Sequence, residues 1–116
     1  MTSRLPKHLH DALTEVRRAS EFLGELEVDA YGANALVRSA VERQLEILGE
    51  ASKRALDEAP ELRDRIPELE LAIGLRNRLI HGYDRVLHPV VVDTVRRDLP
   101  RLRVSLEAEL ARFPLP

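Results

Sequence analysis

The chain contains no cysteine and no tryptophan, and only 3% of its 116 residues are aromatic. Without thiols it can form neither disulfides nor thiolate metal sites, and nothing points to an oxidising compartment. Few aromatic and glycine residues beside abundant Ala, Leu, Glu and Arg are typical of helices rather than strands. We therefore expect an all-α fold, and the length predicts a single domain over residues 1–116.

Long apolar runs are also missing. The N-terminal residues lack the uninterrupted apolar stretch of a signal peptide, and no segment approaches the roughly 18 apolar residues of a membrane span. We expect a soluble, cytoplasmic protein that does not bind membranes.

The charges are nearly balanced overall but unevenly distributed. A net charge of -2 argues against a strongly basic protein that binds nucleic acid without specificity, because phosphate neutralisation needs concentrated cations. The segment 76–103 nevertheless contains seven arginines and three acids. Such a run forms either a solvated helix face or a contact surface for RNA.

Apolar residues recur every three or four positions in four stretches, which is the spacing of amphipathic helices. Pro6 suits the first turn of the first helix, Pro60 ends the second, and Gly82 is the residue type favoured just after a helix end. The expected helices cover about residues 6–27, 35–59, 67–81 and 88–110.

Three local features refine this pattern. The stretch "VDAYGAN" predicts a turn, with Asp29 or Asn34 as a helix cap, and residues 61–68 predict a connector with at most one short helical turn. Pro100 lies inside the last helix and predicts a kink or break near residues 97–100. Gly49 lies inside the second helix, where it predicts a close approach by a neighbouring helix or a partner chain.

The stretch "LRNRLIHGYD" brings together groups suited to cleaving RNA. When the 2′-hydroxyl attacks the adjacent phosphate, an enzyme must move two protons and stabilise negative charge on the phosphoryl oxygens. His81 suits proton transfer near neutral pH, and Arg76 can grip two phosphate oxygens. Four residues separate them, and Tyr83 follows His81 by two.

Helical geometry restricts how these groups cooperate. Residues five apart point about 140° away from each other, so Arg76 and His81 cannot share one face of a continuous helix. Either the helix opens at residues 80–81, or a two-fold dimer brings a second Arg and His to the same cleft. Asn77 lies four residues before His81 and can orient its ring.

These motifs resemble those of a known family. "RNRLIHGY" is similar to the R(x)4HxY signature of HEPN-domain proteins, and "RSAVERQLEILGEASKR" is similar to the second-helix signature of their HepT-like (DUF86) branch. The resemblance extends over residues 29–102 and includes "RRDLPRL". It implies an antiparallel HEPN bundle of four to five helices.

The resemblance further implies an endoribonuclease toxin of a type VII toxin–antitoxin pair that acts as a homodimer without a cofactor or metal. Its RNA-cleaving site would lie at the dimer interface, with Arg76 and His81 as catalytic residues. Tyr83 matches the tyrosine that a minimal nucleotidyltransferase antitoxin, MntA, modifies with AMP. The candidate supporting residues are Asn77, Arg78, Glu50 and Arg43.

Simpler interpretations remain open at several of these positions. Arg76 and His81 also suit a capped helix end, and Tyr83 suits packing where the chain leaves a helix. Glu50 and Arg43 form either a buried polar link or surface salt bridges. The alternative function is a non-catalytic helical dimer that binds a nucleotidyltransferase or RNA.

Overall fold

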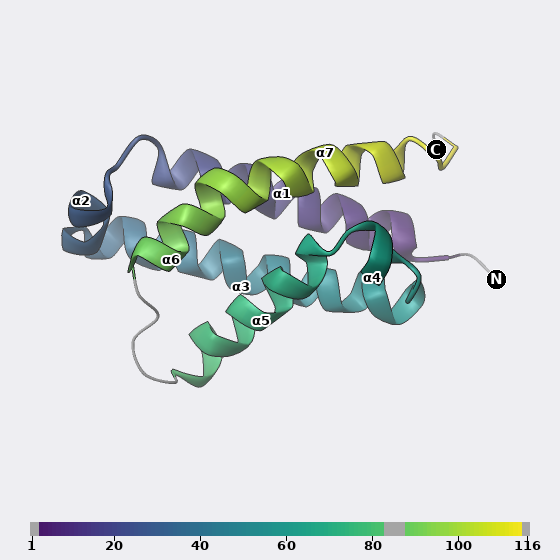
Figure 1. Cartoon of the computed structure of the whole chain (residues 1–116), viewed down its shortest axis with the longest axis horizontal. Coiled ribbons are helices and arrows are strands. Elements are labelled where there is room, and N and C mark those ends of the chain that lie inside the picture. Colours follow the sequence, from purple (N-terminus) through teal and green to yellow (C-terminus); the bar gives the residue numbers. More distant parts are fainter. Residues whose placement is uncertain (1–2, 83–87, 115–116) are drawn as a thin grey trace.

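In the computed structural model, which describes residues 3–82 and 88–114, the chain is an elongated helical bundle of 47 × 27 × 21 Å (Figure 1). The long helices α1 and α3 run antiparallel, α5 packs against α3, and the segment from α6 to α7 lies over α1. The predicted all-α antiparallel bundle is confirmed. The elements are α1 Leu5–Leu23, α2 Val28–Ala33, α3 Ala35–Glu58, α4 Leu62–Arg65, α5 Glu68–His81, α6 His88–Asp93, a π-helical turn η1 Thr94–Asp98, and α7 Leu99–Leu110.

The predicted helix ends agree with the structure where proline, glycine or asparagine marks them. Pro6 lies in the first turn of α1, and Gly82 directly follows the last residue of α5. The side chain of Asn34 accepts a hydrogen bond of 3.0 Å from the backbone N–H of Val37 and so caps α3. The predicted connector before α5 contains the short helix α4.

The segment predicted as a turn is instead a short helix, and that prediction is wrong. α2 occupies residues 28–33. α1 ends at residue 23, four residues before the predicted limit of residue 27, because Gly24 follows it with a φ of 57° that does not continue an α-helix. Tyr31 explains the extra helix, because it is fully buried and its ring meets His88 edge-on with centroids 5.7 Å apart. Burying one large aromatic side chain stabilises a helix that has little tendency to form alone.

Pro100 produces a π-helical turn where a kink or break was predicted. In η1 the backbone N–H of Leu99 bonds to the carbonyl of Thr94, five residues earlier. Proline has no N–H, and its ring would clash with the preceding turn of an ordinary α-helix. The wider turn accommodates the ring, so the backbone stays helical from α6 to α7 instead of dividing into two helices.

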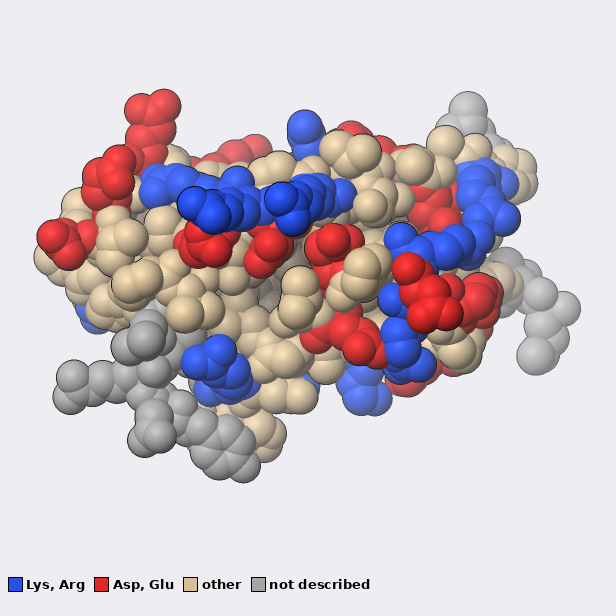
Figure 2. Space-filling view, in the orientation of Figure 1, with Lys and Arg blue, Asp and Glu red and all other residues tan. Residues whose placement is uncertain are grey.

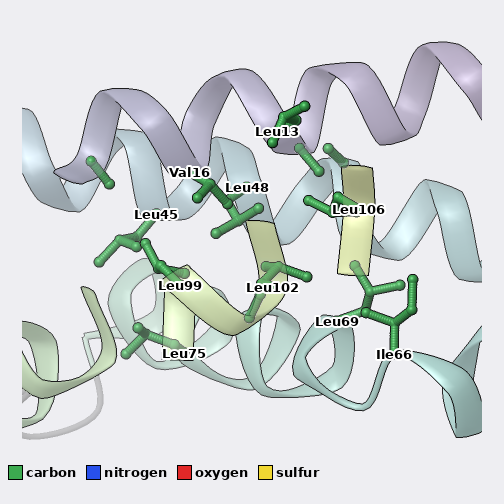
Figure 3. Packing of buried hydrophobic residues seen from close by; sticks show 14 of the residues in the cluster. Leu13, Val16, Leu45, Leu48, Ile66, Leu69, Leu75, Leu99, Leu102 and Leu106 are labelled. Atoms are coloured by element: carbon green, nitrogen blue, oxygen red, sulfur yellow. The ribbon is translucent and has the colours of Figure 1, made fainter. Parts of the chain in front are cut away.

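Leucine side chains from all four long helical segments form the core (Figure 3). These residues repeat at helical spacing along each segment, which is why the sequence pattern located the helices. The leucines with almost no exposed surface are Leu9, Leu23, Leu45, Leu48, Leu62, Leu69, Leu99, Leu102 and Leu106. Within the described residues, every helix is either too short or too polar to cross a bilayer.

Two carboxyl groups are buried among the described residues, those of Glu15 and Glu109. Glu15 of α1 is only 5% exposed; Arg18 donates a hydrogen bond of 3.2 Å to its Oε1, whereas its Oε2 is buried without a hydrogen-bond partner. Burial raises the pKa of Glu15 above its ordinary value of 4.5, and the nearby Arg18 offsets only part of that rise. The folded state therefore disfavours the charged form of this group.

We expect Glu15→Gln to gain stability over the wild type as the pH rises. Below about pH 4.5 the wild-type carboxyl is protonated in both states and the two proteins differ little; above the raised pKa only the wild type carries a buried charge. Urea unfolding between about pH 4 and pH 8, with the exposed Glu21→Gln as control, measures this difference. A difference that does not change with pH would contradict the burial argument.

Candidate functional site

Helix α5 carries Arg76, Asn77, Arg78 and His81 on one uninterrupted backbone. It ends at His81, and Gly82 follows with a φ of 61° and donates its N–H to the carbonyl of Arg78 at 3.2 Å. This is the left-handed helix end for which glycine is best suited. The helix does not open at residues 80–81, so that predicted alternative is wrong, and Arg76 and His81 point about 140° apart.

Arg76 is held from two sides. Its Nη2 lies 2.9 Å from Oε2 of Glu50 on α3, and its Nη1 donates to Oδ1 of Asn77 at 3.1 Å. The side chain of Arg76 is 25% exposed and that of Glu50 is 38% exposed. The guanidinium thus lies at the seam between α3 and α5, with part of its surface open to a ligand.

Gly49 makes this seam possible. A Cβ atom at this position would lie 2.3 Å from Cβ of Arg76 and 2.9 Å from the backbone oxygen of Ala72. The prediction that Gly49 permits close approach of a neighbouring helix is therefore confirmed, and the helix is α5. The residue that follows, Glu50, is then close enough to bind Arg76 directly.

Of the two alternatives predicted for Glu50 and Arg43, surface salt bridges form and the buried link between them does not. Arg43 instead lies 3.5 Å from Glu46 at the surface, and Oε1 of Glu50 lies 3.4 Å from Nε of Arg54. Glu50 and Arg43 are seven residues apart, which separates them by about 10 Å along the helix axis. Each therefore pairs with a residue one turn away, and Arg43 stays outside the contacts of Arg76.

Of the other candidate residues of α5, Asn77 reaches the seam through its hydrogen bond with Arg76. Asn77 and His81 differ by about 40° around the helix, and Arg78 and His81 by about 60°. All three are exposed, and Arg78 also lines a groove of about 310 Å³ between α5 and the α6–η1 segment. His81, Asn77 and Arg78 of α5 are thus exposed to solvent, while Arg76 contacts Glu50 of α3. Tyr83 lies outside the described residues.

Figure 2 shows a row of basic side chains along η1 and α7, with acidic side chains below it. This part of the arginine run contains Arg96, Arg97, Arg101 and Arg103. Two of these arginines have local structural roles. Nη2 of Arg96 donates to the backbone oxygens of Gly24 and Leu26, at 3.3 and 2.5 Å, and so ties η1 to the loop after α1. Arg97 lies 2.9 Å from Asp93.

Sequence reasoning did not find the contact between Glu50 and Arg76 or the second contact of Glu50 with Arg54. Gly49 was the available signal, because an interior glycine marks a close helix contact without naming the partner. Within residues 3–82 and 88–114, no group of three or more His, Asp or Glu side chains is arranged to hold a metal ion.

Comparisons with known proteins identify the family of the chain. The family model described as "Ribonuclease HepT-like" matches residues 12–109, which include Glu50, Arg76 and His81. No solved structure matches the chain at a significant level.

Curated relatives match over most of their length. "Putative RNase MJ1380" of Methanocaldococcus jannaschii is 32% identical over 99 residues, which cover 85% of this chain and 90% of that protein. "Probable ribonuclease HepT" of Thermococcus cleftensis is 34% identical over 100 residues, which cover 86% and 90%. "Putative RNase TTE0752" of Caldanaerobacter subterraneus is 29% identical over 104 residues, which cover 86% and 92%. With the family model matching from α1 to α7, this chain belongs to the HepT-like ribonuclease family.

Proposed function

We propose that this chain is a metal-independent endoribonuclease toxin of a type VII toxin–antitoxin pair, and that it cleaves RNA as a homodimer. The observation that carries the proposal is the placement of Arg76 and His81 on one continuous helix, with Arg76 held by Glu50 and His81 exposed at the helix end. Family membership supports ribonuclease chemistry, and the helix geometry supports a site built from two copies.

The direction of the two side chains supports the proposed dimer. Within one chain, Arg76 turns toward α3 and His81 turns about 140° away, so one phosphate would not meet both groups. A two-fold axis near α5 would bring His81 of one copy toward Arg76 of the other and would form the same contact twice. Asn77, one turn before His81, would orient its ring.

The proposed reaction needs only groups that this site supplies. The 2′-oxygen attacks the adjacent phosphorus, the bond to the 5′-oxygen breaks, and the products are a 2′,3′-cyclic phosphate and a 5′-hydroxyl end. Histidine accepts or donates the protons that move, and the Arg76 guanidinium stabilises the charge on the phosphoryl oxygens. Glu50 leaves part of the guanidinium surface exposed for this contact.

A second candidate function rests on the same ion pair. Because Glu50 neutralises Arg76, the arginine would also serve as a purely structural tether between α3 and α5. The chain would then be a helical dimer that binds a nucleotidyltransferase or RNA without cutting it. Cleavage separates the two functions, since only the enzyme yields RNA products.

We expect the purified protein to cleave RNA in the presence of EDTA. We expect Arg76→Ala and His81→Ala each to lower the cleavage rate by about 10²-fold or more, because each removes a group that acts on the transition state. Gel analysis of a labelled RNA pool measures the rates. Arg43→Ala is the matched control, because Arg43 pairs with Glu46 and does not touch Arg76.

Mixing the two inactive variants tests whether the site is shared between copies. A heterodimer of Arg76→Ala and His81→Ala contains one intact Arg76 and one intact His81, so a shared site recovers part of the activity. No recovery in a mixture shown by light scattering to contain exchanged dimers would contradict the shared site. Full activity of His81→Ala would contradict the catalytic assignment.

The toxin proposal includes a switch at Tyr83. A minimal nucleotidyltransferase of the MntA type would add AMP from ATP to the tyrosine hydroxyl and release pyrophosphate. The anionic adduct, two residues from His81, would repel RNA phosphates and block access to the site. The proposed partners are therefore a second copy of this chain, RNA and the nucleotidyltransferase antitoxin.

We expect co-expression with a nucleotidyltransferase encoded next to this chain to add AMP units to the wild type but not to Tyr83→Phe. Intact-mass measurement detects the added units, and the modified protein should lose RNA cleavage. The chain has two tyrosines, and Tyr31 is fully buried, so Tyr31→Phe is the matched control and should still be modified. Equal modification of Tyr83→Phe would contradict the assignment.

A further inference from the structure

Gly49 lies where α3 packs against α5, and a Cβ added to it would collide with Arg76 and Ala72. The geometry points to Gly49 as a positioning residue that sets where the Arg76 guanidinium lies relative to Glu50. This inference rests on the proposed ribonuclease function, in which Arg76 contacts the scissile phosphate. It assigns a role in the site to a residue that carries no functional group.

The backbone at Gly49 gives no reason for a glycine. Gly49 lies inside α3, and its φ is outside the positive range that other residues avoid. Glycine is a poorer helix former than alanine, so the position carries a conformational cost. The reason is therefore steric and lies in the helix that packs against it.

Atoms of α5 occupy the space that a side chain at position 49 would need. A Cβ at this position would lie 2.3 Å from Cβ of Arg76, 2.9 Å from its Cδ and 2.9 Å from the backbone oxygen of Ala72. Ordinary van der Waals contact begins at 3.4 Å. Two of these three atoms are a backbone oxygen and the first side-chain atom of Arg76, so the clash is relieved only if the helices separate by about 1 Å.

That separation would act directly on the guanidinium. The Cβ of Arg76 lies beside Gly49, and the Nη2 at the other end of its side chain lies 2.9 Å from Oε2 of Glu50, the residue that follows Gly49 on α3. Arg54 lies 3.4 Å from the other carboxylate oxygen and helps to fix its orientation. Gly49 thus sets the height of α5 over α3, and Glu50 sets the direction of the Arg76 side chain.

The chain offers a matched control in Gly74. This glycine also lies inside a helix, α5, but a Cβ added to it would meet nothing within 4 Å. Gly74→Ala therefore makes the same chemical change as Gly49→Ala without moving α5 from α3. The two glycines separate the steric role from the effect of alanine on helix stability.

The experiment compares wild type, Gly49→Ala, Gly74→Ala and Glu50→Gln by steady-state RNA cleavage and by the NMR signal of the Arg76 side-chain Nε–H. Displacing a catalytic group by about 1 Å costs about 10²-fold, so Gly49→Ala should lower kcat by that factor with little change in KM. Its Arg76 signal should shift, whereas the Arg76 signal of Gly74→Ala should match the wild type. Circular dichroism confirms that each variant is folded.

Glu50→Gln tests the same placement without disturbing the helix contact, and it decides the matter if Gly49→Ala fails to fold. It should shift the Arg76 signal and lower kcat. Wild-type kcat and an unshifted signal in either folded variant would overturn the inference, while His81→Ala would still test the proposed function. If the wild type cleaves no RNA, the proposed function fails and the NMR comparison alone decides whether Gly49 and Glu50 position Arg76.

Discussion

The close contact of α3 with α5 is the constraint on which the rest of the site depends. α3 is the central helix of the bundle, because it packs against α1 along one side and against α5 along another (Figure 1). The buried leucines of α3 pack in the core, and Gly49 permits the close contact with α5. Glu50 lies at the edge of that same contact, where it holds an arginine that would otherwise extend into solvent.

Many charged side chains of the molecule likewise form ion pairs with nearby residues. Arginines of α3 and η1 pair with nearby acids, as in Arg43–Glu46 and Arg97–Asp93. Such exposed pairs contribute little to stability, but they cancel the long-range field that a basic protein would present. The molecule, with a net charge of -2, therefore presents no general positive field to anions.

Much of the fold could be predicted from sequence because its signals are local. Pro6, Asn34, Pro60 and Gly82 act on the few residues beside them, and the leucine spacing marks each buried face. α2 was missed because its stability comes from Tyr31, whose partner His88 is 57 residues away. The π-helical turn was missed in form, since Pro100 predicts a disturbance of the helix but does not determine how the backbone accommodates it.

The candidate site divides in the same way. The motif gave Arg76, Asn77 and His81 because they are neighbours on one helix, and helical angles alone excluded a site within a single face. The pairing of Glu50 with Arg76 crosses between helices, and no local pattern encodes which partner an exposed acid selects. The same limit applies within one helix: Arg43 and Glu50 both lie on α3, yet Arg43 pairs with Glu46.

The burial of Tyr31 also gives the protein a built-in spectroscopic reporter. The chain has no tryptophan and two tyrosines, so its near-ultraviolet signals arise almost entirely from tyrosine. Tyr31 is enclosed between α2, α3 and the start of α6, and burial raises its pKa to about 12. A chain whose other tyrosine is replaced therefore reports, through a single ring, whether α2 is seated against the bundle.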